Sequence, residues 1–198
     1  MARKDYEAVD RYLEKHNLGI SMRDLMVLGE GQRVSSLCWL EDARRVLVLR
    51  RRHEPFAGYF TAPGGKLEPG EDPEQCIIRE MQEEAGIQIQ SPQLQLVTSE
   101  RGPENYRWVV FIFRARQYQG QVGTTDEGSF LWVPKEELAR STMLPEVDRL
   151  LLPYMLPLHD HGVHLAHVVY RDDHSVADLA VTPLPPLGAG AGPGVWKA

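Results

Sequence analysis

The segment GGKLEPGEDPEQCIIREMQEEAGI, residues 64–87, constrains the fold more strongly than any other part of the chain. Its first half is rich in Gly and Pro, which predicts a loop rather than a helix. Its second half predicts a helix, because Asp72 can cap the amino end together with Gln75 three residues later. Pro73 suits the first turn of that helix, and Gly86 suits its carboxyl end. The segment is therefore expected to place a loop directly before a well-defined helix.

The expected helix carries an apolar stripe made of Ile77, Met81 and Ala85. Residues spaced by four lie on one face of a helix, so this stripe can pack against a sheet. Burial of the stripe would hold the rest of the helix in a fixed orientation.

A second face of the same helix gathers three carboxylates, Glu80, Glu83 and Glu84. Like charges at this spacing destabilise an isolated helix by roughly 0.2 to 0.5 kcal/mol per pair, and the carboxyl end of a helix disfavours negative charge. A solvated acidic surface is the ordinary explanation for such residues. Arg79 is the one basic residue within the helix, and it can offset only part of the charge. A hard divalent cation bound through oxygen, Mg²⁺ or Mn²⁺, is the alternative remedy.

The preceding loop has the features of a ligand-binding turn. Gly64 and Gly65 allow the backbone to approach a ligand closely, and a free carbonyl there can complete a metal shell. Gly70 permits a sharp turn that brings Glu71 toward the start of the helix. A simple connecting loop could contain the same residues. The loop is therefore evidence for a ligand site only in combination with the acidic helix.

The remaining pattern predicts strands and helices in mixed order. We expect a hairpin from residues 34–41 and 44–52, and a second hairpin near the carboxyl end, over 164–183. The other expected elements are helices at 5–15, 135–141 and 146–156 and strands at 93–99, 107–117 and 129–134. The strand at 107–117 is apolar enough to have both faces covered. This order predicts a sheet with helices on both faces.

Four parts follow along the chain. Residues 1–30 are expected to be a helical extension, 31–157 the main domain, 158–184 a hairpin extension and 185–198 a flexible tail rich in Pro and Gly. The oligomeric state is open, with a homodimer as one option.

Composition excludes several classes of partner. The net charge of −6 gives no general attraction to nucleic acid or to an anionic membrane. No apolar run approaches the roughly 18 residues that a membrane span needs. Two cysteines are too few for a disulfide framework, and the amino-terminal residues lack the apolar core of a signal peptide. A cytoplasmic protein is the natural expectation.

The loop and helix together resemble the signature of the Nudix hydrolases. Gly65, five residues, Glu71, seven residues and then the run from Arg79 to Ile87 match that signature at every defined position. The wider resemblance runs from about Ser35 to Leu156, and it is strongest to the 8-oxo-dGTP diphosphatase branch. It implies a three-layer α/β/α sandwich with a mixed sheet, and hydrolysis of a nucleoside diphosphate linked to another group.

The resemblance also implies roles for the signature residues. Glu80, Glu83 and Glu84 would coordinate Mg²⁺ or Mn²⁺, helped by the Gly65 carbonyl. Arg79 would orient a carboxylate through charge-assisted hydrogen bonds, and Glu71 would support the loop and the helix start. The cations would offset phosphate charge and lower the pKa of an attacking water.

A further acid comes from the segment DEGSFLWVPKEEL. It is similar to the part of the 8-oxo-dGTP diphosphatase branch in which an acid before a Trp reaches the metal site. Asp126 and Glu127 both qualify, and Glu127 aligns better. Glu127 is therefore a metal ligand candidate, and either Glu80 or Glu127 is the candidate general base. A solvated loop acid is the alternative interpretation.

Substrate-binding candidates are more dispersed. In the same branch the purine lies beside an aromatic or apolar residue and an acid, and Leu144 and Glu146 hold the matching places. The usual residue at the first of these places is Trp, so Leu144 puts base stacking and strict recognition of an oxidised base in question. Glu146 also suits the first turn of a helix, which would be a structural role.

Basic and aromatic residues near the variable loop complete the substrate candidates. Arg50 and Arg52, at the end of a strand with Arg51, can contact phosphates, although a basic strand end is commonly just solvated. Phe60, with Phe56 and Tyr59, can line a nucleoside pocket or belong to the core.

The substrate that these features favour is a purine (deoxy)nucleoside triphosphate, either unmodified or oxidised, cleaved to monophosphate and pyrophosphate. An ADP-ribose or dinucleoside polyphosphate hydrolase is the alternative, and Pro103 lies where ADP-ribose hydrolases tend to carry a proline. A non-catalytic nucleotide sensor is disfavoured because the signature is intact. A zinc site is a minor hypothesis, from the cluster His159, Asp160, His161, His164 and His167.

Overall fold

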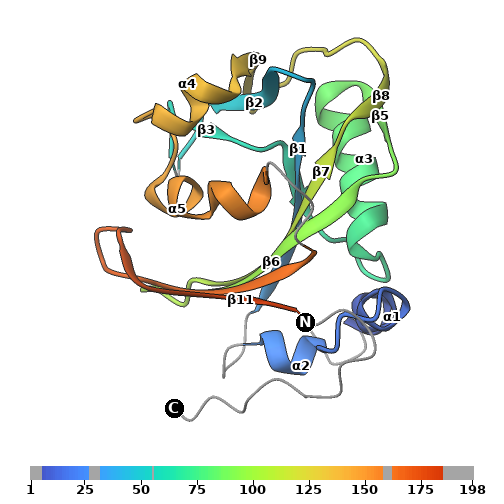
Figure 1. The fold of residues 1–198 in the computed structure, drawn as a ribbon, viewed down its shortest axis with the longest axis vertical. Coiled ribbons are helices and arrows are strands. Elements are labelled where there is room, and N and C mark those ends of the chain that lie inside the picture. The colour runs from blue at the N-terminus through green and yellow to red at the C-terminus, as the bar shows by residue number, and fades with distance from the viewer. Residues whose placement is uncertain (1–5, 27–31, 55, 158–161, 185–198) are drawn as a thin grey trace.

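The computed structural model describes residues 6–26, 32–54, 56–157 and 162–184 (Figure 1). Its main sheet has six strands, in the order β11 (Val176–Pro183), β10 (His164–Tyr170), β6 (Gln93–Arg101), β7 (Arg107–Ala115), β1 (Arg33–Leu40) and β4 (Gly64–Lys66). The pairs β10–β6 and β7–β1 are parallel, and the other pairs are antiparallel. The sheet is therefore mixed, as the resemblance implies. The predicted tail at 185–198 lies outside the described residues.

Two smaller sheets accompany the main one. One has the strand order β3 (Phe60–Thr61), β2 (Arg45–Arg51) and β9 (Gly128–Pro134), and the other pairs β5 (Ile87–Gln90) with β8 (Gln117–Gly120). The helices are α1 (Glu7–Lys15), α2 (Met22–Leu25), α3 (Pro73–Ala85), α4 (Lys135–Arg140) and α5 (Glu146–Met155). In the described ranges no helix is long and apolar enough to span a membrane.

Helices cover both faces of the main sheet. Figure 1 shows α3 and α1 on one side of it and α4 and α5 on the other. The central strand β7 supplies both layers, because Phe111 and Phe113 pack with the α1 and α3 side while Val110 and Ile112 pack with the α5 side. The three-layer fold and the burial of both faces of this strand are thus confirmed.

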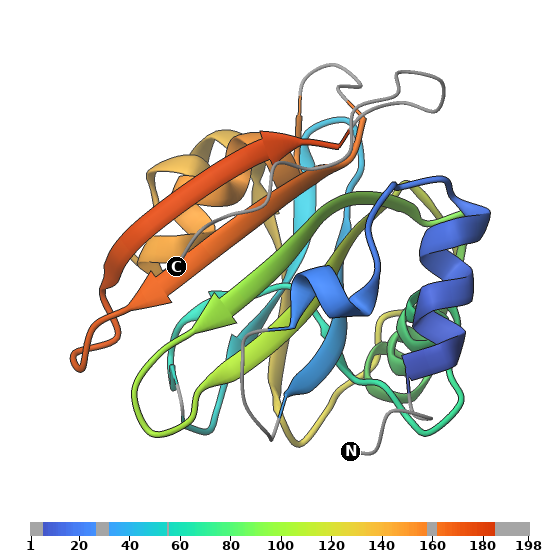
Figure 2. The same ribbon diagram turned by 90° about the horizontal axis from the view of Figure 1, so that it is seen from below.

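The amino-terminal helix is part of the core. Val9 and Leu13 of α1 are fully buried, and the Tyr12 ring meets the edges of Phe111 and Phe113 with centroid distances of 6.4 and 6.3 Å. Figure 2 shows α1 lying beside α3. The expected helix at 5–15 is confirmed within the described residues. The short helix α2 was not expected, because its signal is only a local capping box between Ser21 and Asp24.

The predicted hairpin over 34–41 and 44–52 is wrong in its pairing. Both strands exist, but a single bridge between Glu41 and Val46 is the contact that joins their ends. Strand β1 pairs with β4 and β7, and β2 pairs with β3 and β9. β4 occupies the edge of β1 beside Ser35–Leu37, and β3 occupies the edge of β2 beside Leu49–Arg50, so the two strands do not pair along their length.

The carboxyl-terminal hairpin is present and enlarges the main sheet. β10 and β11 are antiparallel, and β10 adds to β6 in parallel. His164 and His167 are three residues apart in β10, so they point to opposite faces and cannot share one metal ion. The other members of the minor zinc hypothesis, His159, Asp160 and His161, lie outside the described residues.

Glu41 links the ends of three elements. Its carboxylate is 3% exposed and accepts hydrogen bonds from Arg114 Nε, from Arg116 Nε at 2.8 Å and from Lys135 Nζ at 2.7 Å. Burial raises the pKa of Glu41, but the three cationic donors lower it more, so the pKa lies below its usual value. This carboxylate therefore ties the end of β1 to the end of β7 and the start of α4.

We expect Glu41→Gln to lower the free energy of unfolding by about 3 kcal/mol at neutral pH, as when one partner of a buried ion pair is removed. Arg114, 8% exposed, would keep an unpaired charge. Since folding lowers the pKa of Glu41, its contribution is complete above the ordinary glutamate pKa of about 4.3. It is lost as the pH falls through the lower folded-state pKa. Urea unfolding at neutral pH and in acid measures both effects.

Glu7→Gln is the control for this substitution, because Glu7 pairs with Arg11 at the surface and is 69% exposed. It should leave stability unchanged. A deficit of Glu41→Gln that is equally large in acid would contradict the assignment to the ionised carboxylate.

Candidate active site

The helix α3 begins and ends as its sequence predicts. Asp72 Oδ1 accepts hydrogen bonds from the backbone N–H groups of Glu74 and Gln75, both at 2.9 Å, and the Gln75 side chain accepts from the Asp72 N–H at 3.0 Å. Gly86 ends the helix in the left-handed conformation, with φ of 70°. Both ends of the helix are thereby fixed.

The apolar stripe orients the helix. Ile77, Met81 and Ala85 are fully buried, as predicted. Ser36 of β1 donates a hydrogen bond to the carbonyl of Pro73 at 2.8 Å, which holds the first turn against the sheet. The acidic face is consequently presented away from the core, toward β4 and the loop after it.

Arg79 organises the acidic face. Its Nε and Nη2 donate to the two oxygens of Glu71, each at 2.9 Å, and its Nη1 donates to Glu80 at 2.9 Å and to Glu83 at 3.1 Å. Its Nη2 also donates to the Lys66 carbonyl at 3.1 Å. One guanidinium therefore connects the loop, the helix and three carboxylates.

Glu71 supports the loop that precedes the helix. Besides the fork from Arg79, its Oε2 accepts a hydrogen bond from the Glu68 N–H at 2.9 Å. Burial raises the pKa of Glu71, but the donors from Arg79 and Glu68 outweigh it and hold the pKa below its usual range. Glu71 thus remains an anion that fixes Arg79.

Glu84 has no such partner. Its Oε2 is buried and receives no hydrogen bond in the part of the chain that the structure describes. Burial, together with the charges of Glu80 and Glu127, raises the pKa of Glu84 to about 7, although the Gly64 N–H and Arg51 oppose this shift. An acid in this position would be stabilised by a cation.

Gly64 and Gly65 bring the backbone against the acidic helix. Gly64 has a φ of 141°, which an L side chain rarely adopts, and a Cβ at that position would overlap Ser36 of β1. A Cβ on Gly65 would lie closer than 3.0 Å to the carboxylate of Glu80. The Gly65 carbonyl also accepts a hydrogen bond from Cys76 Sγ at 3.6 Å. The turn therefore requires both glycines.

These residues fit a hard divalent cation. The donors are carboxylate and carbonyl oxygens, one buried carboxylate oxygen lacks a partner, and the glycine turn leaves room beside Glu80. Among the described residues, no three His, Cys, Asp or Glu side chains already lie close enough to hold a metal together. Glu83 is 60% exposed and is held by Arg79. The predicted set of Gly65, Glu80, Glu83, Glu84 and Glu127 therefore stays a prediction.

Strand β2 orients its arginines in alternate directions. Arg51 lies on the same face as Leu47, toward the α3 side, and it is the arginine whose charge acts on Glu84. Arg50 lies on the opposite face, and Arg52 donates to the Asp126 carbonyl at 3.3 Å. Sequence reasoning considered all three arginines and selected Arg50 and Arg52, although the alternation of a strand could have separated Arg51 from them.

The remaining substrate candidates lie on the α5 side of the sheet. Leu144 is fully buried and Phe60 is 9% exposed, so both belong to the core. They can affect the shape of a pocket only by supporting the residues that line it. The Glu146 carboxylate accepts a hydrogen bond from the Val176 N–H at 2.8 Å, which links α5 to the carboxyl-terminal hairpin. Phe56 lies against both Tyr59 and His174, with centroid distances of 6.0 and 6.3 Å.

Two acids on this face were missed by the sequence analysis. Buried Glu100 of β6 accepts hydrogen bonds from Thr98 at 2.7 Å, Tyr170 at 3.0 Å and Tyr106 at 3.3 Å. Burial and the charge of Glu100 raise the pKa of Asp148 on α5 to about 7. No local pattern marks these acids, because strands distant in sequence bring them together.

Comparisons with known proteins agree with this geometry. The family model described as NUDIX domain matches residues 31–155. The chain is 35% identical over 130 residues to the uncharacterized Nudix hydrolase YvcI of Bacillus subtilis (strain 168), spanning 63% of this chain and 79% of YvcI. It is 34% identical over 130 residues to the 8-oxo-dGDP phosphatase NUDT18 of Homo sapiens, spanning 65% of this chain but 36% of that protein. The crystal structure of a mutator MutT protein from Bacillus halodurans matches with a TM-score of 0.67 and 26% identity, over 77% of this chain and 99% of that one.

We expect Gly65→Ala to weaken Mn²⁺ binding by about tenfold or more while the chain stays folded. The added methyl group must displace the Glu80 carboxylate, which Arg79 holds in place. Titration of Mn²⁺, followed by electron paramagnetic resonance of the free ion, measures the change.

Gly123→Ala is a matched control, because its Cβ would meet only the Ala85 carbonyl, at an ordinary distance of 3.6 Å. Unchanged Mn²⁺ affinity in Gly65→Ala would remove Gly65 and Glu80 from the proposed site.

Proposed function

Because this chain is a Nudix hydrolase, with its NUDIX domain over residues 31–155, we propose that it cleaves a purine (deoxy)nucleoside triphosphate, either unmodified or oxidised. The products are the monophosphate and pyrophosphate, and the reaction depends on Mg²⁺ or Mn²⁺. The observation that carries this proposal is the unpartnered, buried carboxylate oxygen of Glu84 beside the Gly64–Gly65 turn.

A divalent cation held by Glu80, Glu84 and Glu127 would offset the charge of the phosphate chain and lower the pKa of a nearby water. The chain's own residues prepare the rest of the reaction. Arg79 keeps the loop and the helix at a fixed separation, and the glycine turn admits the phosphates. Arg51 supplies positive charge on the α3 side of β2.

The hydrolysis itself requires one bond to form and one to break. The oxygen of a water molecule bonds to a phosphorus of the anhydride, and the bridging P–O bond of that phosphorus breaks, so that the nucleoside monophosphate and pyrophosphate separate. The proton of that water passes to a carboxylate, for which Glu80 and Glu127 are the candidates. Arg79 donates to Glu80 at 2.9 Å, whereas Glu127 is exposed and free of that constraint, so we favour Glu127 as the base.

Support for an oxidised purine comes from the names of relatives. The Homo sapiens relative is named for 8-oxo-dGDP, and the structural relative from Bacillus halodurans is a mutator MutT protein. In this chain, Phe56, Tyr59 and His174 form an aromatic group that can contact a base. Glu146 is the proposed acceptor for purine N–H groups, although it already receives the Val176 N–H. Leu144 would then contribute only apolar bulk.

No specific observation favours ADP-ribose over a triphosphate. Pro103 lies in a tight turn, closed by hydrogen bonds between Gly102 and Tyr106 and between Tyr106 and Pro103, both at 2.9 Å. The proline is thus explained by local geometry. Cytoplasmic location and the division of the chain at residues 30, 157 and 184 remain predictions from the sequence.

We expect Glu84→Gln to reduce kcat by about a hundredfold or more while the fold is retained. The amide keeps the shape of the side chain but loses the charge that would face the cation. Chromatographic separation of the nucleotide products from dGTP, 8-oxo-dGTP, 8-oxo-dGDP, ADP-ribose and a dinucleoside polyphosphate, each with Mg²⁺ or Mn²⁺, gives kcat/KM for the wild-type and variant chains.

Glu136→Gln, an exposed acid of α4, is the control with the same chemical change. Preference for a triphosphate supports the proposal as stated. Preference for 8-oxo-dGDP or ADP-ribose would keep the metal chemistry and overturn the substrate, and the absence of cation-dependent hydrolysis with every compound would overturn the proposal entirely.

We also expect Arg51→Gln to raise KM for the nucleotide by about tenfold, since a hydrogen bond to a charged phosphate is lost. Arg50→Gln removes the same charge from the opposite face of β2 and should leave KM nearly unchanged. Initial-rate kinetics on the preferred substrate measure both values. The reverse order of effects would restore the assignment based on sequence alone.

A further inference from the structure

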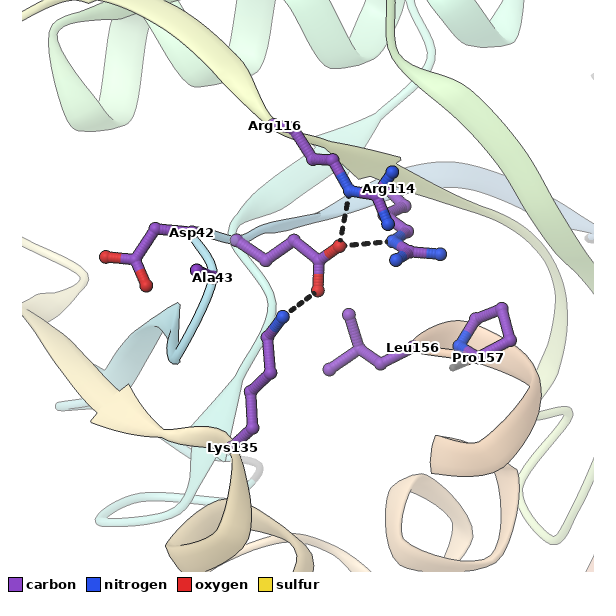
Figure 3. A pocket seen from close by; sticks show the side chains of 8 residues that line it. Asp42, Ala43, Arg114, Arg116, Lys135, Leu156 and Pro157 are labelled. Atoms are coloured by element: carbon purple, nitrogen blue, oxygen red, sulfur yellow. Dashed lines mark hydrogen bonds and ion pairs between the residues drawn. The ribbon is translucent and has the colours of Figure 1, made fainter. Parts of the chain in front are cut away.

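A cavity of about 430 Å³ lies at the end of the main sheet where β1 and β7 stop. Arg114, Arg116 and Lys135 enter it from different elements and converge on the carboxylate of Glu41, while Leu156 and Pro157 form an apolar wall opposite Asp42 and Ala43 (Figure 3). Its volume falls in the range of small-molecule sites, about 300 to 1,000 Å³. The cavity is large enough for a ligand with a charged group.

The charges that line this cavity do not balance. Three cations share the single carboxylate of Glu41, through Arg114, Arg116 and Lys135. The other acid in the lining, Asp42, is already paired with Arg45 at 2.7 Å and accepts the backbone N–H groups of Arg44 and Arg45. The carboxyl end of α5 adds roughly half a negative charge. More than one positive charge is left without a counter-charge.

The cationic groups also keep hydrogen-bonding capacity. A guanidinium has five N–H donors. Among the described residues, Arg114 and Arg116 each donate only from Nε, both to Glu41 Oε1. The four terminal nitrogens of these two side chains can therefore serve another acceptor. Paired guanidinium groups match the several oxygens of a phosphate better than a single spherical halide ion.

The cavity is remote from the candidate active site. Strand β9 runs from Gly128 to Pro134, so Glu127 precedes one end of it and Lys135 follows the other. The two ends of such a strand are about 20 Å apart. A ligand in this cavity would therefore not occupy the position of the substrate phosphates near Glu84.

We propose that the cavity framed by Arg114, Arg116 and Lys135 is a second anion site, which binds a phosphate group about 20 Å from the reaction centre. The net charge of the chain is −6, so general electrostatics would repel such a ligand and the local excess of cations must hold it. The phosphate can be free, as inorganic phosphate or pyrophosphate, or part of a nucleoside monophosphate whose apolar portion contacts Leu156 and Pro157.

The test is a titration of the metal-free full-length chain, at constant ionic strength and with EDTA, followed by ¹H–¹⁵N spectra. Inorganic phosphate, pyrophosphate and GMP are added in separate series. Saturable shifts are expected at the backbone amides of Glu41, Asp42, Arg116 and Lys135. EDTA removes any divalent cation, so this result does not depend on catalysis.

Arg116→Gln should weaken the binding by about tenfold, since a hydrogen bond from a charged donor is lost. Arg116 is 62% exposed, and Glu41 keeps two other partners, so the variant should fold. Lys135→Gln is a second variant with the same expectation. Arg11→Gln, which removes an exposed charge from α1, is the matched control and should leave the affinity unchanged.

Tighter binding of GMP than of inorganic phosphate assigns the site to a nucleotide, and equal binding assigns it to the free anion. Both results support the proposal. It is overturned if these amides show no saturable shift, if Arg116→Gln and Lys135→Gln bind as tightly as the wild-type chain, or if the shifts are confined to Gly65, Glu84 and their neighbours.

Discussion

The contact on which the rest of the candidate site depends is the fork between Arg79 and Glu71. Two parallel hydrogen bonds of 2.9 Å join the guanidinium to the carboxylate and fix the loop against the helix. The same guanidinium then reaches Glu80 and Glu83, and so reduces the repulsion along the acidic face. Without the Arg79 guanidinium, the loop carbonyls and the helix carboxylates would lose the group that fixes their relative positions. Arg79 therefore sets the positions of the oxygens that would bind a metal, although Arg79 itself need not touch that metal.

Arg79 donates hydrogen bonds to Glu71, Glu80 and Glu83. The carboxylate without such a bond, Glu84, is the one that indicates a function. Glu84 is partly buried, the charges of Glu80 and Glu127 help to raise its pKa, and its buried Oε2 has no hydrogen-bond partner among the described residues. A buried carboxylate oxygen without a hydrogen bond costs free energy, so this arrangement does not contribute to the stability of the fold. The apolar stripe and the two helix ends are strong enough to hold it there. The stability of the rest of α3 thus offsets the free-energy cost of the Glu84 carboxylate at the place where a cation would bind.

The two ends of the β2–β9 pair carry opposite electrostatic character. Near Glu127 acids predominate, and near Lys135 cations do, with Glu41 as their shared partner. A strand pair is rigid enough to keep the two regions apart, so a cation and an anion can be held on one chain without cancelling each other.

The sequence alone determined the loop, the capped helix, the acidic face and the apolar stripe, because each depends on residues within one or two turns of each other. The nearly continuous run of apolar residues in 107–117 likewise identified the central strand as buried on both faces. Tertiary structure decided the rest. It separated the expected hairpin of β1 and β2 into different sheets, placed Leu144 and Phe60 in the core, and gathered Arg114, Arg116 and Lys135 around Glu41. These outcomes depend on which strands become neighbours, and strand pairing is set by contacts between residues far apart in the chain, which no local pattern specifies.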